Sequence, residues 1–187
     1  MRGFVAINLP AEVRARLFAA ASPMREAVPG VRWTAIEALH LTLKFLGHFP
    51  DQRVPELAAA VETVAAGYAV FPLRLARAGA FPNARRPRVW WIGVESSDGL
   101  LALQREIDVA TAALGFASEQ RPYAPHLTIG RARGEPRRVP EATTLIDGFA
   151  GRAEFDVASV ELMESRLSRA GARYAAVATA PLKPGSA

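Results

Sequence analysis

His40-Leu41-Thr42-Leu43 and His126-Leu127-Thr128-Ile129 are two copies of one pattern, separated by close to half of the 187-residue chain. The chain contains three histidines, and two of them lie in these copies. In a β-strand, residues two apart point to the same side, so each histidine projects together with its threonine while the intervening leucine enters the core. We therefore predict a duplicated α+β lobe in which both motif strands face a shared cleft.

The rest of the chain supports this reading, because each half contains a long helical stretch, then a motif strand, then another helical stretch. Strands are predicted over residues 2–9, 31–33, 39–46, 71–78, 88–94, 126–130, 153–166 and 172–179. Helices are predicted over residues 10–28, 55–66 and 97–115, with a shorter one within 134–149. Thr34 to Glu37 has capping-box spacing and predicts one helical turn. Strict alternation in the first motif strand predicts that Leu41, Leu43 and Phe45 lie opposite to His40, Thr42 and Lys44.

Two imidazoles and two hydroxyls around a small volume suit a tetrahedral phosphodiester. One neutral imidazole can remove a proton from the attacking oxygen, and the other, protonated, can give its proton to the leaving oxygen. The hydroxyls of Thr42 and Thr128 can hold the non-bridging oxygens, and Arg131, at the end of the second motif strand, can offset charge on phosphorus. Residue patterns alone leave His40 and His126 interchangeable in the two proton-transfer roles, because the two copies are nearly identical.

The composition restricts the cofactors and the surroundings that we expect. Cysteine is absent, and the sequence contains no His-x-x-x-His and no histidine-rich cluster, so neither a metal nor another cofactor is expected. The apolar runs are far shorter than a bilayer span, and the N-terminal stretch is typical of a strand and not of a signal peptide. We expect a cytoplasmic protein that has no contact with a membrane.

The formal net charge is +5, from 23 lysines and arginines against 18 acidic residues. Nearly all of the cations are arginine, which a GC-rich genome explains first, although arginine also binds phosphate oxygens bidentately. A basic surface of this kind would also attract an RNA backbone. Arg85, Arg86 and Arg88 lie in or next to a loop that could contact RNA or remain solvated.

Three aromatic residues are candidates for contact with a base. Trp33, Phe81 and Tyr123 lie in segments that lead to or flank the predicted cleft, where each ring could stack on a base or simply pack. Trp90 and Trp91 point to opposite faces of one predicted strand, and we assign neither of them to the site.

The residues that carry the motifs resemble those of a known family. The chain is similar to the 2H phosphoesterases, and within them to the bacterial RNA 2′,3′-cyclic phosphodiesterases, historically called 2′-5′ RNA ligases. The stretch HLTLKFLG at 40–47 and the stretch RPYAPHLTIGR at 121–131 carry the resemblance, with support from residues 79–93 and 162–165. The resemblance covers nearly the whole chain.

The resemblance implies a bilobal 2H phosphoesterase fold over residues 1–187 as a single domain, with antiparallel sheet, helices outside and a central cleft. It implies a metal-independent RNA 2′,3′-cyclic phosphodiesterase that opens the cyclic phosphate at an RNA end and leaves a 2′-phosphate. His40 would be the proton donor to the leaving 3′ oxygen, His126 the proton acceptor from water, and Arg131 a substrate contact. A weaker reverse reaction, joining RNA ends into a 2′-5′ linkage, is also implied, and we expect a monomer.

Two alternatives share some of these residues. The same site could act on small cyclic nucleotides or on a cyclic phosphate of ADP-ribose, because the chemistry at phosphorus is unchanged. A nucleotide- or RNA-binding module without turnover is the third hypothesis. The histidine pair argues against it, since binding alone does not need two titrating groups facing one phosphate.

Overall fold

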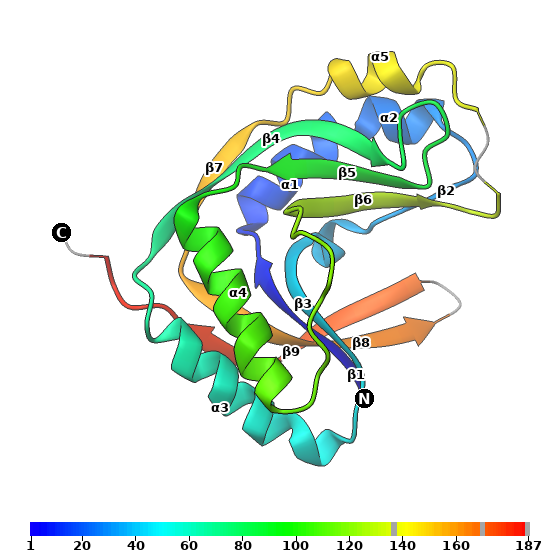
Figure 1. Ribbon diagram of the computed structural model, residues 1–187. Coiled ribbons are helices and arrows are strands. Elements are labelled where there is room, and N and C mark those ends of the chain that lie inside the picture. The colour runs from blue at the N-terminus through cyan, green and yellow to red at the C-terminus, as the bar shows by residue number, and fades with distance from the viewer. Residues whose placement is uncertain (136–137, 169–170, 186–187) are drawn as a thin grey trace.

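The computed structural model describes residues 1–135, 138–168 and 171–185 (Figure 1). Within these residues, an antiparallel sheet has the strand order β7-β4-β5-β6-β3-β1-β8-β9, and β2 pairs with β6 outside that path. The strands are β1 (Arg2–Asn8), β2 (Val31–Trp33), β3 (His40–His48), β4 (Phe71–Phe81), β5 (Val89–Val94), β6 (His126–Ala132), β7 (Ala153–Val157), β8 (Ser159–Ser168) and β9 (Gly171–Pro181). The helices are α1 (Ala11–Ala20), α2 (Ser22–Ala27), α3 (Val54–Ala65), α4 (Asp98–Ala113) and α5 (Ala142–Asp147), with 3-10 turns η1 (Ile36–Ala38) and η2 (Asp51–Arg53).

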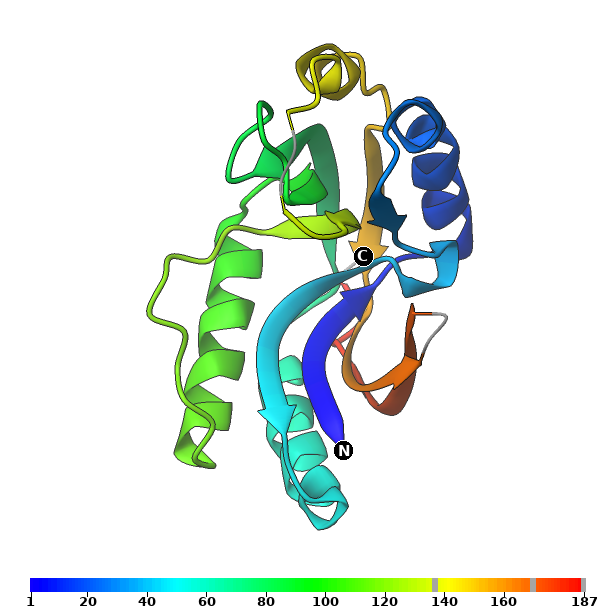
Figure 2. The ribbon, with the colours of Figure 1, turned by 90° about the vertical axis from the view of Figure 1, so that its right-hand side faces the viewer.

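The sheet curls into two halves that carry separate helices (Figure 1). Helices α3 and α4 pack against each other and against β3, β8 and β9, whereas α5 packs on β4 and α1 on β7. In Figure 2, β1 and β3 curve across the front, and the helices lie behind or beside them. The predicted bilobal α+β fold is confirmed. The halves interleave along the chain, because α1 follows β1 in sequence but covers the other half.

The first motif strand contains a β-bulge that changes the direction of its side chains. Val5 of β1 pairs with Lys44, but the next residue of β1 pairs with Thr42, so Leu43 is an extra residue in β3. Two consecutive side chains, Leu43 and Lys44, therefore enter the core. Lys44 is 4% exposed and Phe45 is 66% exposed, so the alternation predicted for these two residues is wrong.

The second motif strand contains the same irregularity at the same position of the pattern. Trp90 of β5 pairs with Gly130, but the next residue of β5 pairs with Thr128, which leaves Ile129 as the extra residue. From the histidine to the sixth residue, β6 and β3 have the same order of half-buried, buried and exposed side chains. The duplication seen in sequence therefore extends to the backbone irregularity, and Arg131 is exposed at the position that corresponds to Phe45.

Three other predicted elements differ from the observed ones. The helix over 10–28 is divided at Ala21, because Pro23 has no N–H to donate and its ring clashes with the preceding turn. The strand over 153–166 is two strands, since the chain leaves β4 and joins β1 at Ala158. The helical turn predicted from Thr34 forms as η1, but without the capping box, because the Thr34 hydroxyl donates to the Thr128 carbonyl at 2.9 Å.

The core lies between the sheet and the helices of both halves. Leu41 and Leu127, the central residues of the two motifs, are 1% and 0% exposed, so the motif strands are anchored from the core side. Among the described residues, no helix has both the length and the apolar character that crossing a membrane requires.

Candidate active site

The two motif strands lie side by side at the centre of the sheet. Leu41 of β3 pairs with Leu127 of β6 in antiparallel register. Because neighbouring residues on each strand point to the opposite face, the histidine and threonine of both motifs share the face that is turned away from the core. Extending this register by one residue in each direction sets His40 across from Thr128 and Thr42 across from His126.

Both histidines are held by the same backbone contact. His40 Nδ1 lies 2.8 Å from the carbonyl oxygen of Ala38, and His126 Nδ1 lies 2.7 Å from that of Ala124. A carbonyl oxygen can only accept, so Nδ1 carries the proton in each ring. The other nitrogen, Nε2, is then the atom that can take up or release a proton at each histidine. The carbonyl two residues upstream thus fixes the same tautomer and a similar orientation in both copies.

The surroundings of His40 are aromatic. Its ring centroid lies 4.7 Å from that of Phe4 and 5.0 Å from that of Tyr174. Burial lowers the pKa of His40 below its usual value, and the hydrogen bond to the Ala38 carbonyl opposes this effect in part. In the free protein, His40 is therefore predominantly neutral at pH 7.

The surroundings of His126 are also aromatic, and one of these residues escaped the sequence analysis. The His126 ring lies 5.2 Å from Phe81 and 6.5 Å from Trp91, and these two rings are 5.2 Å apart. Trp91 lies over Gly79 of β4, where an added Cβ would come within 2.2 Å of the indole. The pairing of Gly79 with Trp91 across β4 and β5 could have identified Trp91. This pairing cannot be recognised without the register between the two strands.

The other two aromatic candidates contact the motif strands in other ways. Tyr123 donates its hydroxyl to the Thr42 carbonyl at 2.8 Å, and burial raises the pKa of this phenol. Trp33 packs 5.8 Å from the fully buried Trp90 and close to Gly130. Tyr123 therefore ties the segment before His126 to the first motif strand, whereas Trp33 packs on the core side of the second.

Arg131 is exposed at the end of the second motif, and Arg32 of β2 is its direct cross-strand partner. Two like charges placed opposite each other on a sheet repel, which favours a site that receives an anion. The sequence analysis did not identify Arg32, because the pairing of β2 with β6 could not be deduced from local pattern. In the basic loop, Arg88 forms a surface ion pair with Glu135 at 3.2 Å, while Arg85 and Arg86 are exposed.

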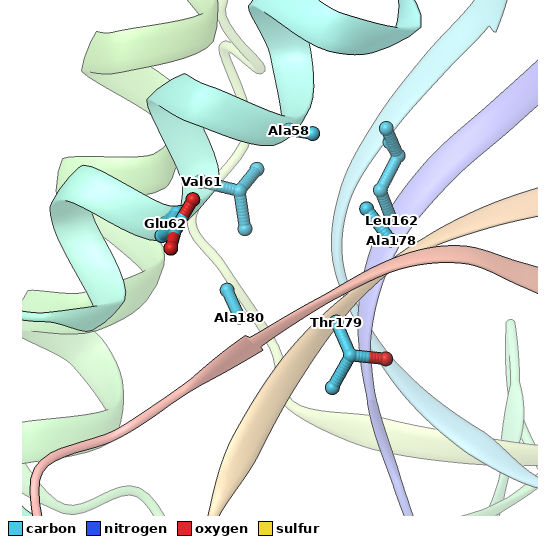
Figure 3. Close-up of a pocket in the computed structure, with 7 residues that line it drawn as sticks. All are labelled: Ala58, Val61, Glu62, Leu162, Ala178, Thr179 and Ala180. Carbon is cyan, nitrogen blue, oxygen red and sulfur yellow. The ribbon is translucent and has the colours of Figure 1, made fainter.

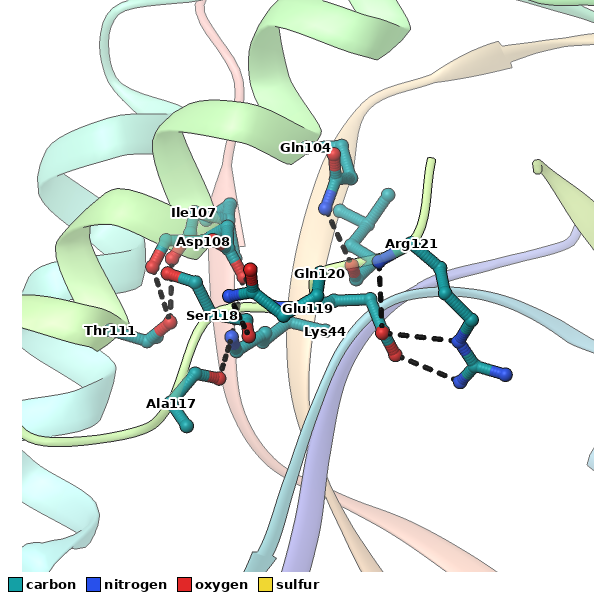
Figure 4. A network of polar contacts seen from close by, with 11 residues as sticks. Lys44, Gln104, Ile107, Asp108, Thr111, Ala117, Ser118, Glu119, Gln120 and Arg121 are labelled. Carbon is teal, nitrogen blue, oxygen red and sulfur yellow. Dashed lines mark hydrogen bonds and ion pairs between the residues drawn. The ribbon is translucent and has the colours of Figure 1, made fainter. Parts of the chain in front are cut away.

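Behind the first motif strand, the buried Lys44 forms a polar network with helix α4 and the segment that follows it (Figure 4). Its ammonium group donates to the carboxylate of Asp108 and to the Ala117 carbonyl, the latter at 2.6 Å. Burial alone would raise the pKa of Asp108, but hydrogen bonds from Lys44 and Ser118 lower it below its usual value. Gln104 also donates to the Leu43 carbonyl, at the bulge itself. This network connects β3 with the segment that leads to His126.

The described part of the chain has a pocket away from the histidines and has no metal-binding group. A small pocket lies between α3 and the β8–β9 pair (Figure 3), and the residues that line it are Ala58, Val61, Glu62, Leu162, Ala178, Thr179 and Ala180. Within the described residues, no group of three or more histidine, cysteine or acidic side chains has an arrangement that could hold a metal ion.

Comparison with known proteins gives a consistent result over most of the chain. A family model described as the 2′-5′ RNA ligase superfamily matches residues 9–169. An RNA 2′,3′-cyclic phosphodiesterase of Methanothermobacter thermautotrophicus is 34% identical over 93% of this chain and 95% of its own. One from Geobacillus stearothermophilus is 33% identical over 96% of this chain, which spans only 56% of that relative's length.

Solved structures resemble the whole fold. The protein TT0787 of Thermus thermophilus superposes with a TM-score of 0.81 at 30% identity and covers 100% of both chains. Escherichia coli LigT in complex with 3′-AMP superposes with a TM-score of 0.75 at 26% identity, over 97% of each chain.

Proposed function

Because the chain belongs to the 2′-5′ RNA ligase superfamily, the 2H phosphoesterases, we propose that it hydrolyses 2′,3′-cyclic phosphate ends of RNA to 2′-phosphates. The observation that carries this proposal is the pair of histidines tethered through Nδ1 on adjacent central strands. Each ring is left with Nε2 for proton transfer, and each has a threonine hydroxyl beside it. This arrangement suits two proton transfers on opposite sides of one phosphorus atom.

The proposed reaction is a single in-line displacement. His126 Nε2 removes a proton from water as the water oxygen forms its bond to phosphorus. The bond from phosphorus to the 3′ oxygen breaks, and His40 Nε2 gives its proton to that oxygen. The product has a 2′-phosphate and a free 3′-hydroxyl, and the two histidines return to their starting states by exchange of a proton with solvent.

The remaining side chains of the motifs stabilise the charge on the phosphoryl oxygens. The hydroxyls of Thr42 and Thr128 donate to the non-bridging oxygens, and Arg131 offsets the negative charge that builds up in the transition state. The repulsion between Arg131 and its neighbour Arg32 supports this role, because a bound anion relieves it.

The donor role of His40 requires a change in its protonation. The lowered pKa of this ring leaves it neutral in the free protein near pH 7, and a neutral imidazole whose Nδ1 is its only donor cannot protonate the leaving oxygen through Nε2. A phosphodiester monoanion beside the ring raises its pKa, because the nearby negative charge favours the imidazolium form. Substrate binding and protonation of His40 are therefore coupled in this scheme.

The same residues serve the weaker reverse reaction. A 5′-hydroxyl replaces water as the attacking group, His126 removes its proton, and His40 again protonates the departing 3′ oxygen. The product is a 2′-5′ linkage next to a free 3′-hydroxyl, and no nucleotide is consumed.

The proposal extends to contacts with RNA beyond the phosphate. Phe81 is the aromatic candidate that best fits stacking on a base, since it is partly exposed and adjoins His126. Arg85 and Arg86, which are exposed on the loop after β4, are suited to the backbone of a longer RNA.

Product analysis on an oligonucleotide with a 2′,3′-cyclic phosphate end tests this function. We expect the 2′-phosphate as the only product, at an unchanged rate in excess chelator. A 3′-phosphate product, or loss of activity in chelator, would contradict the proposed bond cleavage or the metal-free mechanism. Tight binding of the oligonucleotide without any product near neutral pH would favour the binding-module hypothesis.

A second candidate keeps the mechanism and changes the substrate. The mononucleotide 3′-AMP bound to Escherichia coli LigT favours a site that accepts a single nucleotide, such as a small cyclic nucleotide or a cyclic phosphate of ADP-ribose. Comparing kcat/KM on the oligonucleotide and on a 2′,3′-cyclic mononucleotide separates the two candidates. A higher value for the oligonucleotide favours RNA ends.

A further inference from the structure

Two phenylalanines are exposed among the described residues, and each belongs to a group of aromatic rings that includes one motif histidine. Phe45 is 66% exposed and Phe81 is 38% exposed. A phenylalanine in the motif strand would normally alternate into the core, and Phe45 is exposed because of the bulge at Leu43. Its ring is therefore open to solvent next to the aromatic group that includes His40, where a flat ligand can pack on it.

On the His126 side, Phe81 and Trp91 form one aromatic wall. Phe81 lies 5.2 Å from both the His126 ring and the Trp91 ring, and its exposed part leaves room for a third ring. Trp91 is seated over Gly79, which fixes its orientation because any larger residue there would displace it. This wall is therefore packed against the sheet through Trp91 and exposed at Phe81.

On the His40 side, Phe4, Phe45 and Tyr174 form a second wall. Phe4 is 3% exposed and lies 4.7 Å from His40, 6.2 Å from Phe45 and 5.2 Å from Tyr174. Tyr174 meets the His40 ring edge-on at 5.0 Å. Phe4 thus supports both the catalytic candidate and the exposed Phe45 from within the sheet.

We propose that these walls are two nucleobase platforms, one on each side of the phosphate, so that the site accepts two nucleosides joined by a single phosphodiester. This inference rests on the proposed function, because it requires the phosphate to lie between the two histidines. Aromatic rings bind bases of any sequence by stacking, and each stacked base contributes to affinity independently of hydrogen-bond readout. In-line geometry directs the leaving 3′ oxygen and the attacking 5′ oxygen toward different histidines, and each of these oxygens directs its nucleoside toward the wall beside it.

The assignment of the two platforms follows from the proposed proton transfers. The 3′ oxygen that His40 protonates belongs to the nucleoside of the cyclic phosphate, which therefore extends toward Phe45. The attacking group on the His126 side is water in hydrolysis or the 5′-hydroxyl of a second nucleoside in joining. That second nucleoside stacks at Phe81.

The test measures binding of a 2′-5′-linked adenosine dinucleotide by calorimetry to the wild type and to F45A, F81A and the double variant. We expect each single substitution to weaken the dinucleotide Kd about tenfold, and the double substitution to weaken it about 100-fold, since separated stacking contributions add. V109A is the control, because Val109 is an apolar residue on α4 that is 62% exposed, close to the 66% of Phe45. Its dinucleotide Kd should stay within twofold of the wild type.

Inorganic phosphate, which has no base, distinguishes lost stacking from a distorted site. Its Kd should stay within twofold in all variants, and a loss that parallels the dinucleotide would overturn the proposal. Failure of one or both single variants to weaken dinucleotide binding would also overturn it. A wild type that dimerises through Phe45, with F45A monomeric by sedimentation, would show that a second copy covers this wall instead of a base.

The proposed function has its own, separate outcome. A wild type that forms no 2′-phosphate from the cyclic-ended oligonucleotide refutes the hydrolase, whatever the stacking variants do. If the wild type hydrolyses the oligonucleotide while F45A and F81A bind the dinucleotide with unchanged Kd, only the two platforms are refuted.

Discussion

The motif strands β3 and β6 share the same backbone features from the histidine to the bulge, and they differ in the residues that follow the bulge. Both begin with a histidine tethered to the carbonyl two residues upstream, and both contain an extra residue at the fourth position. After the bulge, β3 has a buried lysine, Lys44, and an exposed Phe45, whereas β6 has Gly130 and Arg131. The two strands thus share a histidine and a threonine, whereas beyond the bulge one strand has an exposed apolar side chain and the other an exposed cationic one.

Replacing either motif histidine tests the feature that the two strands share. This replacement should lower activity more than any other change. We expect His40→Asn and His126→Asn each to lower kcat for hydrolysis of a cyclic-ended oligonucleotide by about 10²- to 10⁴-fold, which is the usual contribution of a general acid or base. The double variant should be little slower than the worse single variant, because both groups act in one step. H48N is the control, since His48 is exposed at the far end of β3.

Loss of activity in only one of the two histidine variants would contradict the equivalence of the two motif copies. If His40→Asn retained most of the activity while His126→Asn lost it, the copies would not share the proton transfers, and the reaction would depend on one imidazole alone.

Lys44 provides the next largest effect, on stability. We expect Lys44→Met to lower the free energy of unfolding by about 1–3 kcal/mol, because it leaves the partly exposed carboxylate of Asp108 without its cation. The double variant Lys44→Met/Asp108→Leu should recover most of this loss, since it removes both charges. Urea denaturation measures both changes.

A loss below about 1 kcal/mol for Lys44→Met would show that the network behind β3 does not hold the strand, and that the bulge there is stable without it.

Arg131 tests the cationic end of the site. We expect Arg131→Gln to lower kcat/KM by about 10- to 100-fold, which corresponds to one charged hydrogen bond to the phosphate. The loss should shrink as salt rises, because salt screens the wild-type interaction more than the variant's. R16Q on α1 removes the same charge from an exposed helical position and is the control. Equal losses in both variants would indicate a general charge effect instead of a specific contact.

The alternation of the motif strands could be predicted as far as Thr42 and Thr128, because a two-residue period needs no knowledge of neighbouring strands. Lys44 and Phe45 could not be placed, since the bulge arises from the pairing of β3 with β1. Trp91 was missed for a similar reason: its seat over Gly79 depends on the register between β4 and β5. The local pattern thus predicted the proposed catalytic groups, whereas the residues around them depend on long-range pairing.

The smallest expected effect concerns the protonation of His40 in the free protein. Burial lowers the pKa of folded His40, so below about pH 6.5 the unfolded chain binds more protons at this ring than the folded protein does. The contribution of His40 to the free energy of unfolding is therefore complete above that pH and is lost as pH falls toward the folded pKa.

We expect His40→Gln to flatten the decline in stability between pH 7.5 and about pH 5, as measured by urea denaturation at each pH. Asp108, whose lowered pKa has the same sign of effect, adds to the decline only below about pH 5, where its carboxyl in the unfolded chain begins to take up protons. Parallel stability curves for wild type and variant would mean that burial does not lower the pKa of His40. The proposed coupling between substrate binding and protonation of His40 would then be contradicted.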